Sequence, residues 1–275
     1  KYMNPISRNN DNERRAQLRR LIQPFILRRR KEEVLEELPA KTEVNLTVEL
    51  STGERAFYEA LRQQALDEID RAEGPNKRFQ VLAQLTKLRQ AACHPALVDS
   101  KVQLDSSKLA LVAETIKELR EGNHKALIFS QFVKHLRLVE EWVKAEGIPY
   151  QYLDGSTPGP KRDEAVQAFQ RGEGDVFLIS LKAGGTGLTL TAADYVLHLD
   201  PWWNPAVEDQ ASDRAHRIGQ QRPVTVYRFV TENTIEEKIV ALHQEKRDLA
   251  DSLLSGTEMS ASLSSDQLLS LIKAG

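Results

Sequence analysis

Hydrophobic positions change their spacing along the chain, and the second half shows the clearest pattern. From residue 106 onward, short apolar runs alternate with longer stretches in which apolar residues recur every three or four positions. The apolar runs are 126–129, 150–153, 176–179, 195–199 and 224–230. The stretches of helical spacing are 108–121, 133–146, 161–170 and 205–217. Strands that alternate with helices of this length are typical of βαβ units, so the pattern predicts an α/β fold with a parallel sheet flanked by helices.

The first half of the chain predicts one strand followed by helices. Residues 41–50 alternate apolar and polar side chains, as a half-buried strand does. Ser51 and Glu54 form a capping-box pattern that opens a helix, and the run 74–76 (Gly-Pro-Asn) ends it. The other predicted segments are a helix over 18–27 interrupted at Pro24, a helix over 77–93, a Ser-rich flexible linker over 255–265 and a short amphipathic turn over 266–272.

Two further helix starts are visible in the sequence. Thr157 followed by Pro158 predicts an N-cap with proline at the first helical position. Thr234 with Glu237 predicts another capping box, which opens a long helix to about residue 254.

Composition narrows the class of protein. The 275 residues carry 38 Lys+Arg and 40 Asp+Glu, a net charge of −2, which excludes a globally basic nucleic-acid binder but not a locally basic groove. Cys93 is the single cysteine, so no internal disulfide can form, and with six scattered histidines a structural zinc site is not expected. We expect Cys93 and His198 to be core residues, and no apolar run is long enough to span a membrane.

A glycine-rich loop follows the predicted strand 176–179. It reads SLKAGGTGL over 180–188, with three glycines in four positions that let backbone N–H groups approach an anion closely. Lys182 adds a positive charge to this loop. The loop is either a phosphate cradle or a turn whose glycines are required by backbone geometry alone.

Gln210, Arg214 and Arg217 lie on one predicted helix. At helical spacing they fall within an arc of about 60°, so one face would present two guanidinium groups and an amide. Guanidinium forks match phosphate oxygens. The alternative is a solvated face whose arginines pair with Asp209 and Asp213.

Two adjacent tryptophans lie in the tract DPWWNP, residues 200–205. Neighbouring side chains point in different directions, so Trp202 and Trp203 are not both expected in the core. One of them is suited to lie against nucleic acid, although a packed rigid turn explains the composition equally well.

Several common catalytic motifs are absent from the sequence. It contains no P-loop, no nucleophile elbow, no H-E-x-x-H motif and no dinucleotide-binding fingerprint.

In this order, five motifs closely resemble the SWI/SNF family of helicase-like ATPases. They are HKALIFSQF (124–132), LDGST (153–157), SLKAGGTGLTL (180–190), DYVLHLDPWWNP (194–205) and QASDRAHRIGQ (210–220). Upstream, PFILRRRKEEVLEELPAK (24–41) resembles the junction after that family's first lobe, LRQAACHPALV (88–98) its helical protrusion, and 236–254 its bracing helix. The resemblance covers roughly residues 14–255.

The resemblance implies a RecA-like second lobe and a division of the chain. The expected parts are a junction (1–50), a helical protrusion (51–104), the second RecA-like lobe (105–232), and a bracing helix with a flexible tail (233–275). Because the chain starts abruptly on a predicted helix, Lys1 is not expected to be the natural start. The family binds ATP and Mg²⁺ mainly on the first lobe, which is missing here.

The family's site residues carry over to matching positions. Arg214 and Arg217 match the arginine fingers that reach the triphosphate, Gln210 helps couple nucleotide to DNA, and Gly187 falls in the nucleotide-binding set. The positions that match the family's grip on DNA are Ser130, Gln131, Gly155, Ser156, Lys182, Gly184, Gly185, Thr186 and Trp203. Many members carry arginine where this chain has Lys182, so identical geometry is not expected there.

The resemblance implies that this chain is the C-terminal half of an ATP-driven DNA translocase. The complete protein would be a DNA-dependent ATPase that translocates along double-stranded DNA and remodels protein–DNA complexes, while this chain alone would not hydrolyse ATP. Its partners would be duplex DNA, the first lobe of the same protein and a DNA-bound protein complex, with no membrane. It would be cytoplasmic and nucleoid-associated in a prokaryote, or nuclear in a eukaryote. The alternative is a non-catalytic nucleic-acid-binding or protein-interaction module with a motor-like fold.

Overall fold

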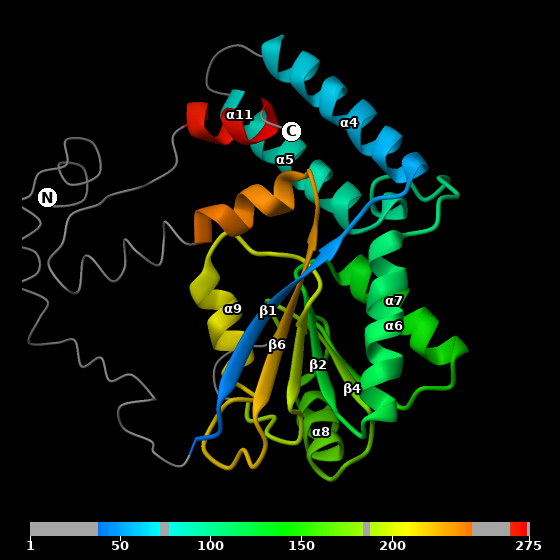
Figure 1. The fold of residues 1–275 in the computed structure, drawn as a ribbon, viewed down its shortest axis with the longest axis vertical. Coiled ribbons are helices and arrows are strands. Elements are labelled where there is room, and N and C mark those ends of the chain that lie inside the picture. Colours follow the sequence, from blue (N-terminus) through cyan, green and yellow to red (C-terminus); the bar gives the residue numbers. More distant parts are fainter. Residues whose placement is uncertain (1–37, 72–76, 184–187, 244–264, 274–275) are drawn as a thin grey trace, which may run out of the picture.

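The computed structural model describes residues 38–71, 77–183, 188–243 and 265–273 (Figure 1). Within these residues one sheet of six parallel strands has the order β1-β6-β5-β2-β4-β3. The strands are β1 (Lys41–Val48), β2 (Ala126–Ser130), β3 (Tyr150–Leu153), β4 (Val176–Ser180), β5 (Tyr195–His198) and β6 (Val224–Thr231). The predicted α/β fold is confirmed, and because every strand is parallel, all carboxyl ends lie at one edge of the sheet.

Helices cover both faces of the sheet. The described helices are α4 (Thr52–Asp70), α5 (Lys77–Cys93), α6 (Ser107–Glu121), α7 (Val133–Ala145), α8 (Gly159–Gln170), α9 (Pro205–Ser212), α11 (Ser265–Lys273), the 3-10 turn Pro95–Leu97 and a helical stretch over 235–243. On one face Ile128 of β2 packs with Val112 of α6 and Val139 of α7. On the other face Phe129 packs with Phe169 of α8. Burial of both faces explains why β2 and β4 read as continuous apolar runs.

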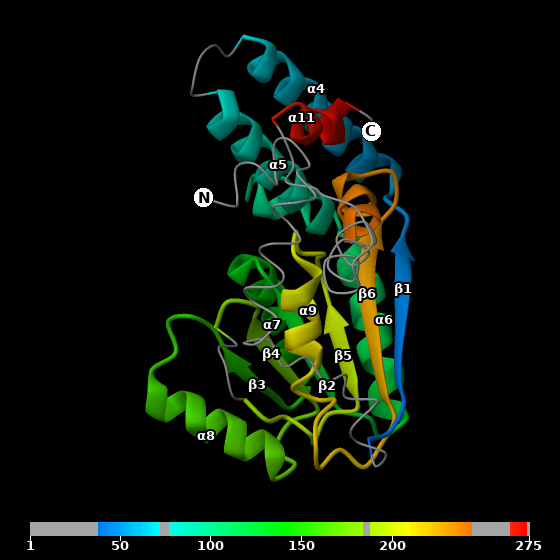
Figure 2. The same ribbon diagram turned by 90° about the vertical axis from the view of Figure 1, so that its left-hand side faces the viewer.

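A separate group of helices lies beyond the carboxyl edge of the sheet. We call α4, α5, helix 235–243 and α11 the helical group. Its core includes Tyr58, Leu85, Ile239 and Ile272. Figures 1 and 2 show that β1 and β6 point toward it. The helical group therefore faces the loops that follow the strands.

β1 lies in the sheet of the lobe. It pairs with β6 along its whole length, from Lys41 opposite Val224 to Val48 opposite Thr231. The strand was assigned to the junction 1–50, and in the structure it is an edge strand of the sheet. The predicted helix over 18–27 and the linker over 255–264 lie outside the described residues, as does the helix beyond residue 243.

The first predicted helix cap is confirmed and the other two differ. Ser51 Oγ accepts from the Glu54 N–H at 3.3 Å, and the Glu54 carboxylate accepts from the Ser51 N–H at 3.0 Å. Thr157 does not cap α8, because its hydroxyl instead accepts from the Asp154 N–H at 3.0 Å.

The cap at Thr234 forms in part. Its hydroxyl accepts from the Glu236 N–H at 3.2 Å. The carboxylate of Glu237 accepts from Asn233 N–H at 2.8 Å and not from Thr234, so the reciprocal bond of a capping box is displaced by one residue.

The predicted helix 205–217 is wrong at its C-terminal end. α9 stops at Ser212, and the segment that follows is a series of turns. Gln220 holds these turns, because its amide donates to the carbonyls of Thr191, Ala193 and Ala215 at 3.2, 2.7 and 3.0 Å. Gly219 has a φ of +99°, which glycine adopts readily. Gln210, Arg214 and Arg217 therefore do not share one helical face.

Candidate functional site

The predicted DNA-contacting residues meet at the carboxyl edge of the sheet. They follow four strands that are neighbours in the sheet, β5, β2, β4 and β3. Ser130 ends β2 and Gln131 follows it, Lys182 follows β4, Gly155 and Ser156 follow β3, and Trp203 follows β5. Loops at this edge are where open α/β sheets place ligands. Gly184, Gly185, Thr186 and Gly187 lie outside the described residues.

The loop after β3 is exposed and internally ordered. Gly155 and Ser156 face solvent, and a Cβ built on Gly155 would meet no atom within 4 Å. The N–H and hydroxyl of Ser156 both donate to Asp154 Oδ1, at 2.8 and 2.6 Å. Burial acts to raise the pKa of Asp154, but the bonds from Ser156 and from the Tyr152 hydroxyl lower it overall. The backbone of Gly155 is therefore accessible to solvent, and the turn around it is held by the bonds between Ser156 and Asp154.

Ser130 is turned inward. Its hydroxyl donates to the Asp200 carboxylate and accepts from the Phe132 N–H at 3.0 Å. The Gln131 N–H donates to the other Asp200 oxygen at 3.2 Å. Burial raises the pKa of Asp200 to about 6. In this arrangement the buried Ser130 hydroxyl makes its hydrogen bonds within the protein, so it does not contact a phosphate directly.

The two tryptophans do point in different directions. Trp202 packs against the cluster of the sheet face that carries α8 and α9, and Trp203 packs against the helical group. Between them lies the guanidinium of Arg89, 5.3 Å from both ring centroids. Arg89 comes from α5 and is buried. Arg89 lies within the LRQAACHPALV motif (88–98), but nothing in its local spacing predicted this role.

Arg214 is a buried cation with an open donor. Its guanidinium carbon lies 5.5 Å from the centroid of the Phe129 ring, and among the described residues its Nη1 atom has no hydrogen-bond partner. Burial lowers the pKa of Arg214 to about 10, so the group stays charged at neutral pH. Arg217 and Gln210, which lie three and four positions from Arg214 in the sequence, are both exposed to solvent. A buried guanidinium of this kind favours binding of an anion, because an anion would supply both charge and acceptors.

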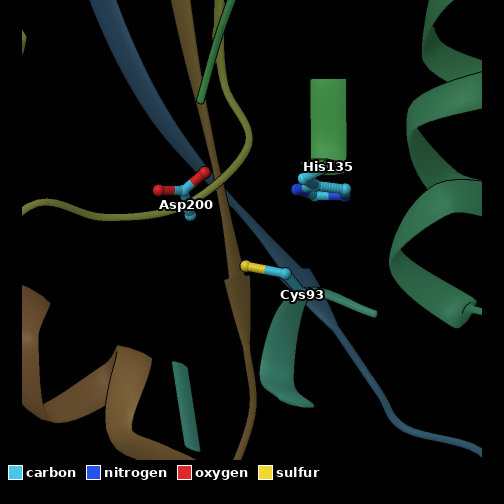
Figure 3. A group of neighbouring side chains, drawn as sticks. All are labelled: Cys93, His135 and Asp200. Carbon is cyan, nitrogen blue, oxygen red and sulfur yellow. The ribbon is translucent and has the colours of Figure 1, made fainter. Parts of the chain in front are cut away.

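Cys93, His135 and Asp200 lie close together inside the molecule (Figure 3). They come from α5, α7 and the loop after β5, and their donor atoms lie within 4.8 Å of one another. Neither ring nitrogen of His135 has a partner among the described residues, and burial lowers its pKa to about 3, so the ring is neutral. Cys93 and His198 are both buried, as predicted, and His198 bonds Ser212 Oγ at 2.9 Å.

The charges around this cluster are balanced. Lys108 and Glu236 form a fully buried ion pair at 2.6 Å. Arg89 is the counter-charge of Asp200, because each carries the leading charge that favours the ionised form of the other. Two carboxylates therefore face two cations in the same interior.

The Lys108–Glu236 pair also joins distant elements. Lys108 of α6 donates to the Leu199 carbonyl at 3.0 Å, and Glu236 accepts from the Thr231 N–H at 2.9 Å. The pair thus connects α6, the ends of β5 and β6, and helix 235–243. No local spacing in the sequence indicated it.

Two family models match this chain. Residues 1–97 match the SNF2-related domain, and residues 107–219 match the helicase conserved C-terminal domain. The "putative ATP-dependent helicase/translocase YwqA" of Bacillus subtilis is 40% identical over 98% of this chain and 30% of its own length. The human "SWI/SNF-related matrix-associated actin-dependent regulator of chromatin subfamily A member 1" is 34% identical over 94% of this chain and 26% of its own length. The chain thus spans a third or less of these relatives.

Solved structures agree with the sequence matches. The "SWI2/SNF2 ATPase C-terminal domain" of Sulfolobus solfataricus is 30% identical, with a TM-score of 0.69 over 86% of this chain and 99% of that one. The "SWI2/SNF2 ATPase core in complex with dsDNA" of the same organism is 34% identical, with a TM-score of 0.70 over 96% of this chain and 57% of that one. The chain therefore belongs to the SWI/SNF family of helicase-like ATPases, and it forms that family's second RecA-like lobe.

Proposed function

We propose that this chain is the C-terminal lobe of a DNA-dependent ATPase that translocates along double-stranded DNA and remodels protein–DNA complexes. The observation that carries the proposal is the buried Arg214 guanidinium, whose Nη1 atom has no partner among the described residues. A buried guanidinium with an unused donor is what an arginine finger for a triphosphate requires. The DNA-bound relative supports the same conclusion, and so do relatives named as ATP-dependent.

In the nucleotide step, Arg214 and Arg217 act as arginine fingers on ATP. The triphosphate and Mg²⁺ are held mainly by the first lobe, Gly187 belongs to the nucleotide-binding set, and Gln210 couples nucleotide to DNA. A guanidinium supplied to the transferring phosphate is worth about 10³–10⁵ in rate, because it neutralises charge that develops in the transition state. The open donor of Arg214 fits that role.

In the DNA step, the loops at the carboxyl edge hold one strand by its phosphates. Lys182 supplies charge and the exposed Gly155 supplies a backbone donor, while Ser156 and Gln131 belong to the same grip by fixing their loops through Asp154 and Asp200. Gly184, Gly185 and Thr186 belong to the same grip, Trp203 lies against the duplex, and Ser130 acts through Asp200. Such contacts do not read sequence, and they weaken as salt rises. The protein would act wherever DNA is packaged, in a nucleoid or a nucleus.

Two substitutions in the complete protein separate these steps. Arg217→Ala should reduce DNA-stimulated ATP turnover by about 10³-fold or more, with duplex affinity nearly unchanged, because the arginine serves the phosphate of ATP. Lys182→Ala should weaken duplex affinity and lower the slope of log affinity against log salt by about one, because a phosphate contact is lost. Turnover is measured with and without duplex DNA, and affinity by anisotropy of a labelled duplex.

The outcomes distinguish the proposal from its alternative. Equal loss of DNA binding in Arg217→Ala would mean that the arginine contacts DNA and not ATP. A complete protein that binds duplex DNA but shows no ATP turnover would make this lobe part of a non-catalytic binding module.

A further inference from the structure

Arg89 connects the helical group to the loops at the carboxyl edge. It lies on α5, whose neighbouring residues Leu85 and Leu88 are anchored in the core of the helical group. Its Nη1 donates to Gln131 Oε1 at 2.9 Å, and its Nη2 donates to the Pro201 carbonyl at 2.7 Å. One planar guanidinium therefore bonds both the loop after β2 and the loop after β5.

The bonds of Gln131 leave its position little freedom. Its backbone N–H is held by the Asp200 carboxylate, and its side-chain oxygen is held by Arg89. Since Arg89 can only donate, the amide must turn its oxygen toward the guanidinium. The amide nitrogen Nε2 is buried and has no hydrogen-bond partner among the described residues. Backbone and side chain of Gln131 are thus fixed from two different elements.

Three aromatic rings enclose the same guanidinium. Its carbon lies 5.5 Å from the Phe132 centroid and 5.3 Å from those of Trp202 and Trp203. Rings at this distance attract a cation through their quadrupole. Because Trp203 also packs on the helical group, Arg89 sets where the DNA-facing tryptophan sits relative to Gln131.

We propose that Arg89 is a positioning residue that fixes Gln131 and Trp203 in the geometry needed to grip DNA, and so couples the helical group to that grip. The inference rests on the proposed DNA-binding function of the carboxyl edge. Lysine cannot replace this arginine, because an ammonium is a point donor on a flexible stem and does not bond two separate loops in a fixed plane.

The test uses the complete protein and compares Arg89→Lys with Arg71→Lys. Arg71 is an exposed arginine at the end of α4, so its variant makes the same chemical change away from the loops. We measure the duplex concentration that gives half-maximal stimulation of ATP turnover, the maximal rate and the thermal unfolding midpoint. Arg89→Lys should raise the half-stimulating concentration about tenfold with little change in maximal rate, as expected for loss of a charged hydrogen bond. Arg71→Lys should match the wild type.

A double-mutant cycle tests whether Arg89 acts through Gln131. In a Gln131→Ala background, Arg89→Lys should raise the half-stimulating concentration by a smaller factor than in the wild type, because the part of its effect that passes through Gln131 is already lost. Equal effects in both backgrounds, or a wild-type half-stimulating concentration in Arg89→Lys, would overturn the inference. If Arg89→Lys does not fold, Phe132→Leu decides the question, because it removes a ring that holds the guanidinium and leaves Gln131 and Trp203 unchanged; it must also raise the half-stimulating concentration, and a wild-type value would overturn the inference. A wild-type protein that duplex DNA does not stimulate would contradict the proposed function instead.

Discussion

The Asp200 carboxyl group is buried, and burial disfavours its charged form. Burial raises its pKa to about 6, against the opposing effects of Arg89 and the Ser130 hydroxyl. In the unfolded chain an aspartate titrates near 3.9. Between these values the folded protein binds more protons than the unfolded chain. The contribution of Asp200 to the free energy of unfolding therefore falls as pH rises from about 4 to about 6.

Asp200→Asn should remove this dependence. The amide stays neutral, so the difference in free energy of unfolding between variant and wild type should shift in favour of the variant as pH rises from about 4 to 6. The shift should reach up to about 3 kcal/mol, since each pKa unit is worth about 1.4 kcal/mol. Urea unfolding at several pH values measures it. A difference that stays constant across this range would show that Asp200 does not titrate there.

Residue-level prediction from sequence succeeded where partners are close along the chain. Ser51 and Glu54 are three positions apart, and their capping box forms as predicted. Arg89 bonds partners 42 and 112 positions away, so no local spacing could indicate it. Ser130 matched a family motif, yet its hydroxyl faces Asp200, 70 residues later in the chain. Side-chain direction at a strand end depends on which strand lies beside it.

The elements meet through buried charge as well as apolar packing. The Lys108–Glu236 pair holds α6 against helix 235–243, with both side chains excluded from solvent. Burial alone would lower the pKa of Lys108, but Glu236 outweighs it and the pKa is raised. The ammonium is therefore charged at all pH values at which the protein would be handled.

Glu236→Gln should destabilise the fold strongly. Removing one partner leaves a buried ammonium unpaired, which costs about 3–5 kcal/mol in free energy of unfolding. Combining it with Lys108→Met should recover a substantial part, because no lone charge remains. Lys117→Met is the matched control, since it breaks the exposed Lys117–Glu146 pair and should cost under about 1 kcal/mol. Urea unfolding at pH 7 distinguishes these outcomes, and similar losses at both sites would contradict the argument.

Periodicity identified the strands and most helices, because it reports which faces are buried. It failed after Ser212, where apolar spacing continues but the chain turns. The cause is Gln220, whose amide is bound to carbonyls at Thr191 and Ala193, almost thirty residues earlier. A polar anchor of this kind leaves no periodic signal, and the shared helical face predicted for Arg214 and Arg217 was lost with it.

At the scale of the molecule, one lobe presents two separate surfaces. The loops proposed to hold DNA follow β5, β2, β4 and β3 at the carboxyl edge, while Arg214 lies over Phe129 on the face covered by α8 and α9. The net charge of −2 gives no general attraction for DNA. Under the proposed function, affinity for DNA therefore comes from the groups on these loops, and ATP turnover depends on Arg214 and Arg217.

The chain alone should fold and yet fail to turn over ATP. Both faces of its sheet and its helical group have buried cores of their own. However, the sequence contains no P-loop lysine and no acidic magnesium motif, so the arginines have no bound triphosphate to act on. ATP turnover is measured for the chain alone and for the chain joined to its native upstream lobe, each with and without duplex DNA. Only the joined form should be active and stimulated by DNA. Turnover by the chain alone, abolished by Arg217→Ala, would place a complete nucleotide site within these residues.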